Sequence, residues 1–174
     1  MVAQIRGKHR FRAVIEIGAG GGRWTRWLHT RSDRMLCIDR ATASAKHIAA
    51  LGLEPPPMNL VCTYGHLPTG PGSPLHDAFD FGFSYDTFVH LDRVTIATYM
   101  RSLRDAIRPG GHAVIHVATD ENKLPEQPTD RSGCWQPINE ACFNELARSN
   151  GFRLLDTIRA RHGYGSRVCS FRRE

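Results

Sequence analysis

The feature that most constrains the fold of this chain is an apolar segment that runs directly into a cluster of glycines. Residues 13–17 read Ala-Val-Ile-Glu-Ile, and four of the next five residues, from Gly18 to Gly22, are glycines. Such a short apolar run is typical of a buried strand in a parallel sheet. Glycines let the backbone take positive φ and approach a ligand, and the N-terminus of a following helix offers free N–H groups. The pattern therefore predicts a strand, a ligand-binding turn and a helix of an α/β fold.

Strand-like and helix-like segments alternate along the rest of the chain, and the segments 65–78 and 119–137, with three prolines each, are predicted as loops. Strands are predicted at residues 13–17, 35–38, 59–64, 79–85, 112–118, 154–158 and 167–171, and helices at 23–32, 41–51, 92–108 and 139–150. This alternation indicates a Rossmann-like, doubly wound, mainly parallel seven-stranded sheet with an antiparallel C-terminal hairpin.

The length of 174 residues fits one domain, expected at residues 13–174 after a short basic N-terminal extension at 1–12. The formal charge of +6 is compatible with nucleic acid, an anionic membrane, an acidic small molecule or simply a solvated basic surface. Five cysteines without a C-x-x-C pair argue against a disulfide framework and a zinc site, and suit a reducing cytosol. No signal peptide or membrane-spanning run is recognisable, so a cytoplasmic protein without a membrane partner is expected.

The glycine turn fails two common phosphate-binding patterns. A dinucleotide-binding turn needs G-x-G-x-x-G/A, and Arg23 stands at its third position. A P-loop needs a lysine after its glycines, and none follows here. The remaining pattern is E-x-G-x-G-x-G, beginning at Glu16. Asp39 ends the second predicted strand, about twenty residues after the glycine turn, which is the separation at which a carboxylate can bind ribose hydroxyls.

Four segments together resemble the class I S-adenosylmethionine-dependent methyltransferases. They read VIEIGAGGGRWT, LCID, FDFGFSYDTFVHL and LRDAIRPGGHAVIHV, in the family's order between Val14 and Val117. Short pieces, such as FVHL, VIHV and the segment after Cys134, are also similar to small bacterial methyltransferases of sugar, glycan or natural-product clusters. The resemblance implies a methyltransferase with S-adenosylmethionine as cofactor. It further implies a small-molecule acceptor, such as a sugar or an acidic metabolite, with O-methylation favoured.

Around the first two strands, the resemblance implies the methionine and ribose subsites of the cofactor. Glu16 is expected to order the turn and the cofactor's amino group, although a surface carboxylate that caps the helix is the alternative. Asp39 is expected to accept both ribose hydroxyls, with a plain turn residue as the alternative, and Arg40 to border the adenine. The glycines expected to pack on the methionine part are Gly18, Gly20 and Gly22.

After the fourth strand, the resemblance implies contacts with the ammonium group and the acceptor. Ser84 and Tyr85 are expected to offer backbone carbonyls to the ammonium group. His90 is the first candidate for the catalytic base that a hydroxyl acceptor needs, and Asp86 is the second. A capping or packing role is equally open for His90. His116 on the fifth strand is compatible with either a core histidine or a substrate contact.

Two features depart from the family pattern. Many relatives carry an acidic residue after the third strand that accepts from the adenine amino group, but residues 62–66 contain none. Adenine is then held by backbone, by Tyr64 or by stacking. Relatives also carry helices before the glycine strand, where twelve residues precede Ala13 here. That cover is either missing, supplied by the partner subunit of a homodimer, or lost to a wrongly assigned start.

Three other functions stay open. A nucleic-acid or ribosomal-component methyltransferase is disfavoured, because Ser-Tyr-Asp-Thr at residues 84–87 replaces the N-P-P-Y of many base methyltransferases. The chain also has no separate recognition module and no basic run interleaved with aromatic residues. A non-catalytic module of the same fold would not turn over. A nicotinamide oxidoreductase is the least favoured, because Arg23 breaks the glycine fingerprint.

Overall fold

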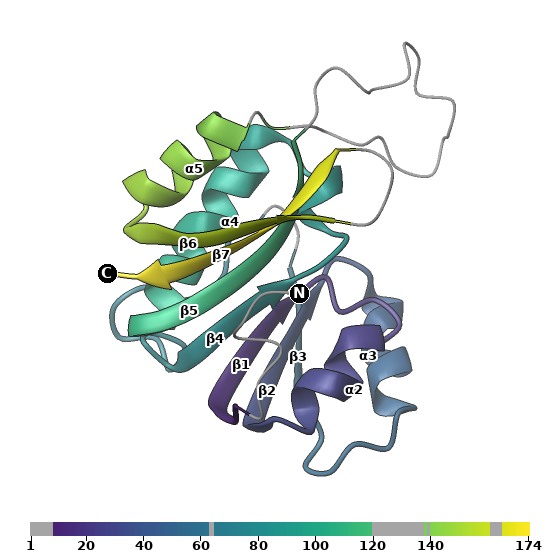
Figure 1. The fold of residues 1–174 in the computed structure, drawn as a ribbon. Helices are drawn as coiled ribbons and strands as arrows, with labels where there is room; N and C mark the ends of the chain where they lie inside the picture. Colours follow the sequence, from purple (N-terminus) through teal and green to yellow (C-terminus); the bar gives the residue numbers. More distant parts are fainter. Residues whose placement is uncertain (1–8, 63–64, 120–137, 139, 161–164) are drawn as a thin grey trace.

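The computed structural model describes residues 9–62, 65–119, 138, 140–160 and 165–174. In this part of the chain a twisted sheet has helices on both faces (Figure 1). The strands are β1 (Phe11–Ile17), β2 (Ser32–Asp39), β3 (Met58–Val61), β4 (Phe79–Ser84), β5 (Ile107–Ala118), β6 (Phe152–Arg159) and β7 (Ser166–Arg173). The helices are α2 (Arg23–His29), α3 (Thr42–Ala49), α4 (Arg93–Ala106) and α5 (Glu140–Ser149), with a short 3-10 helix, η1 (Phe88–His90), before α4.

The sheet has the strand order β3-β2-β1-β4-β5-β7-β6. The first five strands pair in parallel, and β7 pairs antiparallel with both β5 and β6. This confirms the predicted seven-stranded sheet and its antiparallel C-terminal hairpin. The order reverses between β1 and β4, so the loops after β1, β2 and β4 surround a topological switch point, where ligands bind in open α/β sheets.

Successive residues of the central strands point to opposite faces of the sheet and fill two separate cores. In β1, Ile15 belongs to the core beneath α4 and α5, whereas Val14 packs in the core of Leu28 from α2 and Ile48 from α3. Both faces exclude water, which explains why the central strands read as continuous apolar runs. None of the helices in the described ranges is long and apolar enough to cross a membrane.

Several element boundaries differ from the sequence predictions, among them those of β1, β2, α4 and β3. β1 begins at Phe11, inside the predicted N-terminal extension, because the buried Phe11 ring stacks on Phe81 at a centroid distance of 4.2 Å. α4 ends at Ala106, so the Pro-Gly-Gly at residues 109–111 lies inside β5 and does not end the helix. The backbone is already extended at Ile107, which pairs with Phe79 of β4. β3 ends at Val61, and Cys62 already lies outside the strand.

Candidate active site

The glycine turn joins the carboxyl end of β1 to α2. Gly18, Gly20 and Gly22 all have positive φ, at 78°, 50° and 79°. A Cβ at Gly18 would overlap Thr87, and one at Gly22 would overlap Leu51, whereas a Cβ at Gly20 would meet nothing within 4 Å. The turn is therefore packed against the protein at both ends and open in the middle, where a ligand can reach the backbone.

Asp39 ends β2 beside this turn and holds it in place. One of its carboxylate oxygens accepts from the Gly20 N–H at 2.7 Å, and the other accepts from the Ala41 N–H at 2.9 Å. Ser44 of α3 donates its hydroxyl to the Gly20 carbonyl at 2.9 Å. Asp39 thus ties the glycine turn to the segment after β2. Because an ionised carboxylate has about four acceptor positions, Asp39 retains capacity for further donors such as ribose hydroxyls.

A hollow adjoins Asp39 between β2, α3 and β3. Its lining includes Cys37, Asn59 and Val61. The Val61 side chain is apolar and 51% exposed, so it offers an accessible apolar surface at the end of β3. Arg40 is exposed directly after Asp39. Tyr64, the predicted adenine contact, lies outside the described residues.

Glu16 lies buried beneath the turn and is 2% exposed, which excludes the alternative of a surface carboxylate. Its carboxylate accepts from the Thr25 hydroxyl of α2 at 2.6 Å and from the Cys37 thiol of β2 at 3.9 Å. Burial raises the pKa of Glu16 to about 7, because the ionised form loses hydration, while the bonds from Thr25 and Cys37 act in the opposite direction. The charge beneath the turn therefore changes near neutral pH.

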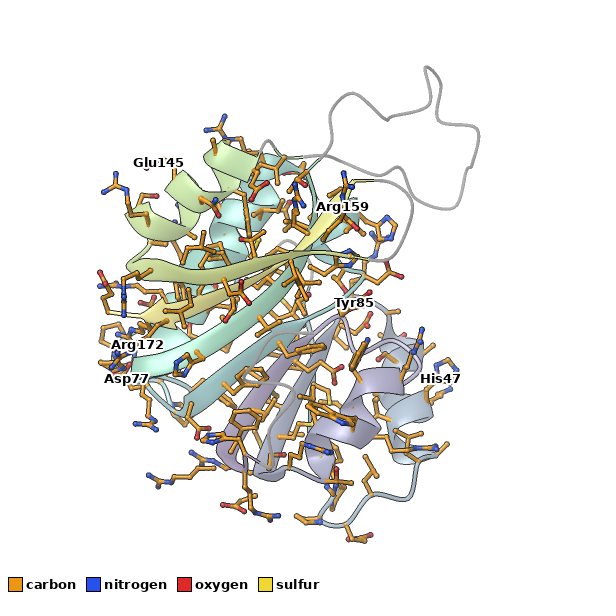
Figure 2. All side chains as sticks on the ribbon, viewed as in Figure 1. His47, Asp77, Tyr85, Glu145, Arg159 and Arg172 are labelled. Atoms are coloured by element: carbon orange, nitrogen blue, oxygen red, sulfur yellow. The ribbon has the colours of Figure 1, made fainter. Side chains whose placement is uncertain are left out.

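The segment after β4 packs against the glycine turn. The buried Ser84 donates its hydroxyl to the last carbonyl of β1 at 3.0 Å. The half-buried Tyr85 ring packs between Trp24 of α2 and His116 of β5, at centroid distances of 5.1 and 4.4 Å. Figure 2 shows Tyr85 at the edge of the sheet where β4 ends. Ser84 and Tyr85 thus lie beside the glycine turn and α2.

Two opposite charges act on the Tyr85 hydroxyl. Burial raises its pKa, the Asp86 carboxylate raises it further, and the Arg23 guanidinium lowers it. Asp86 is exposed, with a positive φ of 60°. Arg23, the first residue of α2, therefore lies close enough to Tyr85 for its charge to act on the hydroxyl. In the sequence, Arg23 mattered only as the residue that excludes a dinucleotide-binding turn.

His90 ends η1, four residues after Asp86. Its backbone N–H donates to the Thr87 carbonyl at 3.0 Å. The side chain is exposed, which argues against the alternative of a packing residue and leaves the imidazole accessible to an acceptor.

The loops after β1, β2 and β4 bring the predicted residues to one edge of the sheet. Sequence reasoning missed two threonines of this edge. Thr25 is the partner of Glu16, and its only signal was its place in the first turn of α2. Thr87 fills the space that a side chain at Gly18 would need, and no sequence pattern indicates that contact.

Comparison with known proteins identifies the family. The family model described as "Methyltransferase domain" matches residues 14–111, more than half of the chain. The chain belongs to this family, which confirms the resemblance to the class I S-adenosylmethionine-dependent methyltransferases and to their cofactor, S-adenosylmethionine. A search of curated proteins found no match.

Solved structures share the fold of almost the whole chain at low sequence identity. An S-adenosylmethionine-dependent methyltransferase from Mesorhizobium loti has a TM-score of 0.79 and 16% identity, covering 97% of this chain and 94% of that chain. The 1,6-didemethyltoxoflavin-N1-methyltransferase of Burkholderia thailandensis, solved with 1,6-didemethyltoxoflavin and S-adenosylhomocysteine, has a TM-score of 0.75 and 20% identity, covering 98% and 78%. The [4+2]-cyclase SpnF has a TM-score of 0.72 and 15% identity, covering 95% and 76%. At these identities the likeness establishes the fold alone, and SpnF illustrates that this fold does not define one reaction.

Proposed function

We propose that the protein transfers a methyl group from S-adenosylmethionine to a small-molecule acceptor, with a hydroxyl as the favoured acceptor group. The observation that carries this proposal is the glycine turn, which is open at Gly20 and bonded there to Asp39. An open backbone turn beside a carboxylate with unused acceptor positions fits a ligand that carries both an amino-acid part and a ribose.

The other cofactor subsites follow from the same edge of the sheet. The hollow beside Asp39 would take the adenine, with Val61 as an apolar surface and Arg40 at its border. The Ser84 and Tyr85 carbonyls would accept from the ammonium group, and Glu16 would add negative charge beneath it when ionised. Val61 would pack on the adenine ring but offers no acceptor for its amino group, so the role of the missing acidic residue after β3 would fall to backbone or to another side chain.

The protein's part in the reaction is alignment, exclusion of water and transfer of one proton. Bound S-adenosylmethionine supplies an electrophilic methyl group that is displaced in line by the acceptor. His90 would take the proton of a hydroxyl acceptor as it attacks, with Asp86 as the second candidate, since both side chains are exposed beyond β4. Arg23 adds positive charge near Tyr85, which favours an acidic acceptor over a neutral sugar.

A methyl acceptor screen in the presence of S-adenosylmethionine tests this proposal. We expect the cofactor to bind in calorimetry, NADH to give no heat, and a sugar or acidic metabolite to accept the methyl group. His90→Ala should lower turnover by about 100-fold or more while leaving cofactor affinity nearly unchanged, because general base catalysis contributes about that much. His47→Ala, an exposed histidine of α3 (Figure 2), is the matched control and should keep full activity.

Three results would contradict the proposal in different ways. No heat with S-adenosylmethionine would favour the non-catalytic module, and a fully active His90→Ala would remove His90 as the base. Salt-sensitive RNA binding together with methylation of RNA would favour the nucleic-acid alternative, because phosphate contacts weaken steeply with ionic strength.

A further inference from the structure

His116 of β5 makes two contacts with the segment that follows β4. It is fully buried, and its Nδ1 accepts from the Asp86 backbone N–H at 3.2 Å. Its ring also stacks on the Tyr85 ring at 4.4 Å, with an interplanar angle of 21°. One side chain therefore contacts two consecutive residues of a loop that lies 30 positions earlier in the chain.

The bond to Asp86 supports a backbone conformation that a residue with a side chain rarely adopts. Asp86 has a φ of 60°, in the left-handed region, where non-glycine residues persist only when the surroundings fix them. Its N–H is a donor, so Nδ1 of His116 must be the unprotonated nitrogen of the ring, and the neutral ring carries its proton on Nε2. His116 thus supplies an acceptor for the N–H of the left-handed Asp86.

The same loop forms one wall of the glycine turn. The Thr87 hydroxyl donates to the Tyr85 carbonyl at 3.5 Å, and Thr87 occupies the space next to Gly18. A rotation of the Asp86 peptide would therefore shift both the Tyr85 carbonyl and the Thr87 side chain. Those groups border the place where the methionine part of the cofactor is proposed to lie.

We propose that His116 is a positioning residue of the cofactor site, which holds the Asp86 peptide and thereby sets the Tyr85 carbonyl and Thr87 against the glycine turn. This inference rests on the proposed function, since it concerns the same site. It assigns His116 neither to the acceptor nor to the methyl group. The histidine acts through the loop, by accepting one hydrogen bond and by packing on one ring.

Two substitutions separate the hydrogen bond from the ring contact. His116→Phe keeps a ring of similar size against Tyr85 and removes the acceptor. His116→Asn removes the ring and places an amide oxygen at the same number of bonds from the backbone as Nδ1. Val114→Ala is the control, because Val114 is fully buried on the same strand and faces the same core, away from Asp86.

We expect His116→Phe to weaken S-adenosylmethionine binding about tenfold, as for one lost hydrogen bond, and His116→Asn to restore binding to within about threefold of the unsubstituted protein. The loss of thermal stability should rank the variants differently from the loss of binding, since His116→Asn and the Val114→Ala control leave cavities and His116→Phe does not. Unchanged affinity in His116→Phe would overturn the proposal. Equal losses in the Phe, Asn and Val114→Ala variants would also overturn it, because they would indicate a general effect of stability.

Amide hydrogen exchange of Asp86 tests the same contact without any cofactor. The Asp86 amide should exchange slowly in the unsubstituted protein and in His116→Asn, and much faster in His116→Phe. If the unsubstituted protein binds no S-adenosylmethionine, the proposed function fails, yet this exchange pattern still reports whether His116 holds the loop. Fast exchange of Asp86 in the unsubstituted protein would overturn the positioning role itself.

Discussion

Glu16 links the stability of the protein to pH. Its pKa is raised from 4.5 to about 7 by burial, so the folded state favours the protonated carboxyl. A raised carboxyl pKa costs no stability below the unfolded value, and the cost grows as pH rises from about 4.5 to about 7 and then stays constant. Over that interval the cost amounts to about 3 kcal/mol.

Glu16→Gln should therefore be more stable than the unsubstituted protein at pH 8, by up to about 3 kcal/mol, and equal to it near pH 4.5. Urea unfolding at a series of pH values measures the difference. Glu145→Gln is the control, because Glu145 is an exposed partner of Arg148 on α5 and has a lowered pKa. The same pH dependence in the Glu16→Gln variant and the unsubstituted protein would show that Glu16 titrates normally.

Asp39 holds the glycine turn and is proposed to bind the ribose, and one substitution tests both roles. Asp39→Asn keeps the size of the side chain but offers one acceptor oxygen where the carboxylate uses two, at Gly20 and Ala41. Calorimetry should show S-adenosylmethionine affinity reduced at least tenfold, as for the loss of a charge-assisted hydrogen bond. Asp33→Asn, an exposed partner of Arg10 at the other end of β2, should bind normally. Full affinity in Asp39→Asn would remove Asp39 from the ribose subsite.

At the scale of elements, different glycines of the turn between β1 and α2 are expected to matter for stability and for cofactor binding. The left-handed glycines differ in their surroundings, since Gly18 faces Thr87 and Gly20 faces open space. Gly20→Ala should therefore cost only the backbone penalty, about 1–2 kcal/mol, while its methyl group obstructs the cofactor. Gly18→Ala adds an overlap with Thr87 and should cost more stability. Thermal unfolding and cofactor titration of both variants test this contrast, which fails if Gly20→Ala binds as tightly as the unsubstituted protein.

The sequence predicted these elements where one local signal dominates. The strands β1, β2 and β4 are apolar runs buried on both faces, so burial and pattern agree. The prediction of the junction between α4 and β5 was wrong, because the Pro-Gly-Gly at residues 109–111 locally indicates the end of a helix. The pairing of Ile107 with Phe79, which no local pattern encodes, ends α4 at Ala106. The contact of Thr87 with Gly18 was invisible for the same reason.

At the scale of the whole molecule, the fold could be predicted and the acceptor could not. Glu16, Asp39 and Ser84 lie at or near the carboxyl ends of three strands. Because these strands are parallel neighbours in the sheet, the sequence already predicts that the three residues lie close together. The proposed contacts with the acceptor, in contrast, come from exposed side chains such as Arg23 and His90, whose positions depend on loops and not on periodicity.

The interior of the sheet depends strongly on β7. Phe171 is fully buried and packs against Phe143 of α5 and Phe152 of β6, at ring distances of 5.6 and 6.4 Å. Phe171→Ala should destabilise the protein by about 3–5 kcal/mol, because it opens a cavity between α5 and the sheet. Leu154→Ala, at a position 38% exposed on the edge strand β6, is the control and should cost far less. Equal losses in urea unfolding would contradict an interior role for β7.

The place of β7 also has a consequence for how the protein is made. β7 follows every other strand in the sequence, yet it lies between β5 and β6, and the buried Arg173 near its end donates to Asp77 and to the Ile107 carbonyl. On the ribosome, β6 therefore emerges with no neighbour to pair with, and the sheet cannot close until residue 173 has left the exit tunnel. The parallel strands around the glycine turn all precede β7 and can pair early, whereas β6 joins the sheet only through β7.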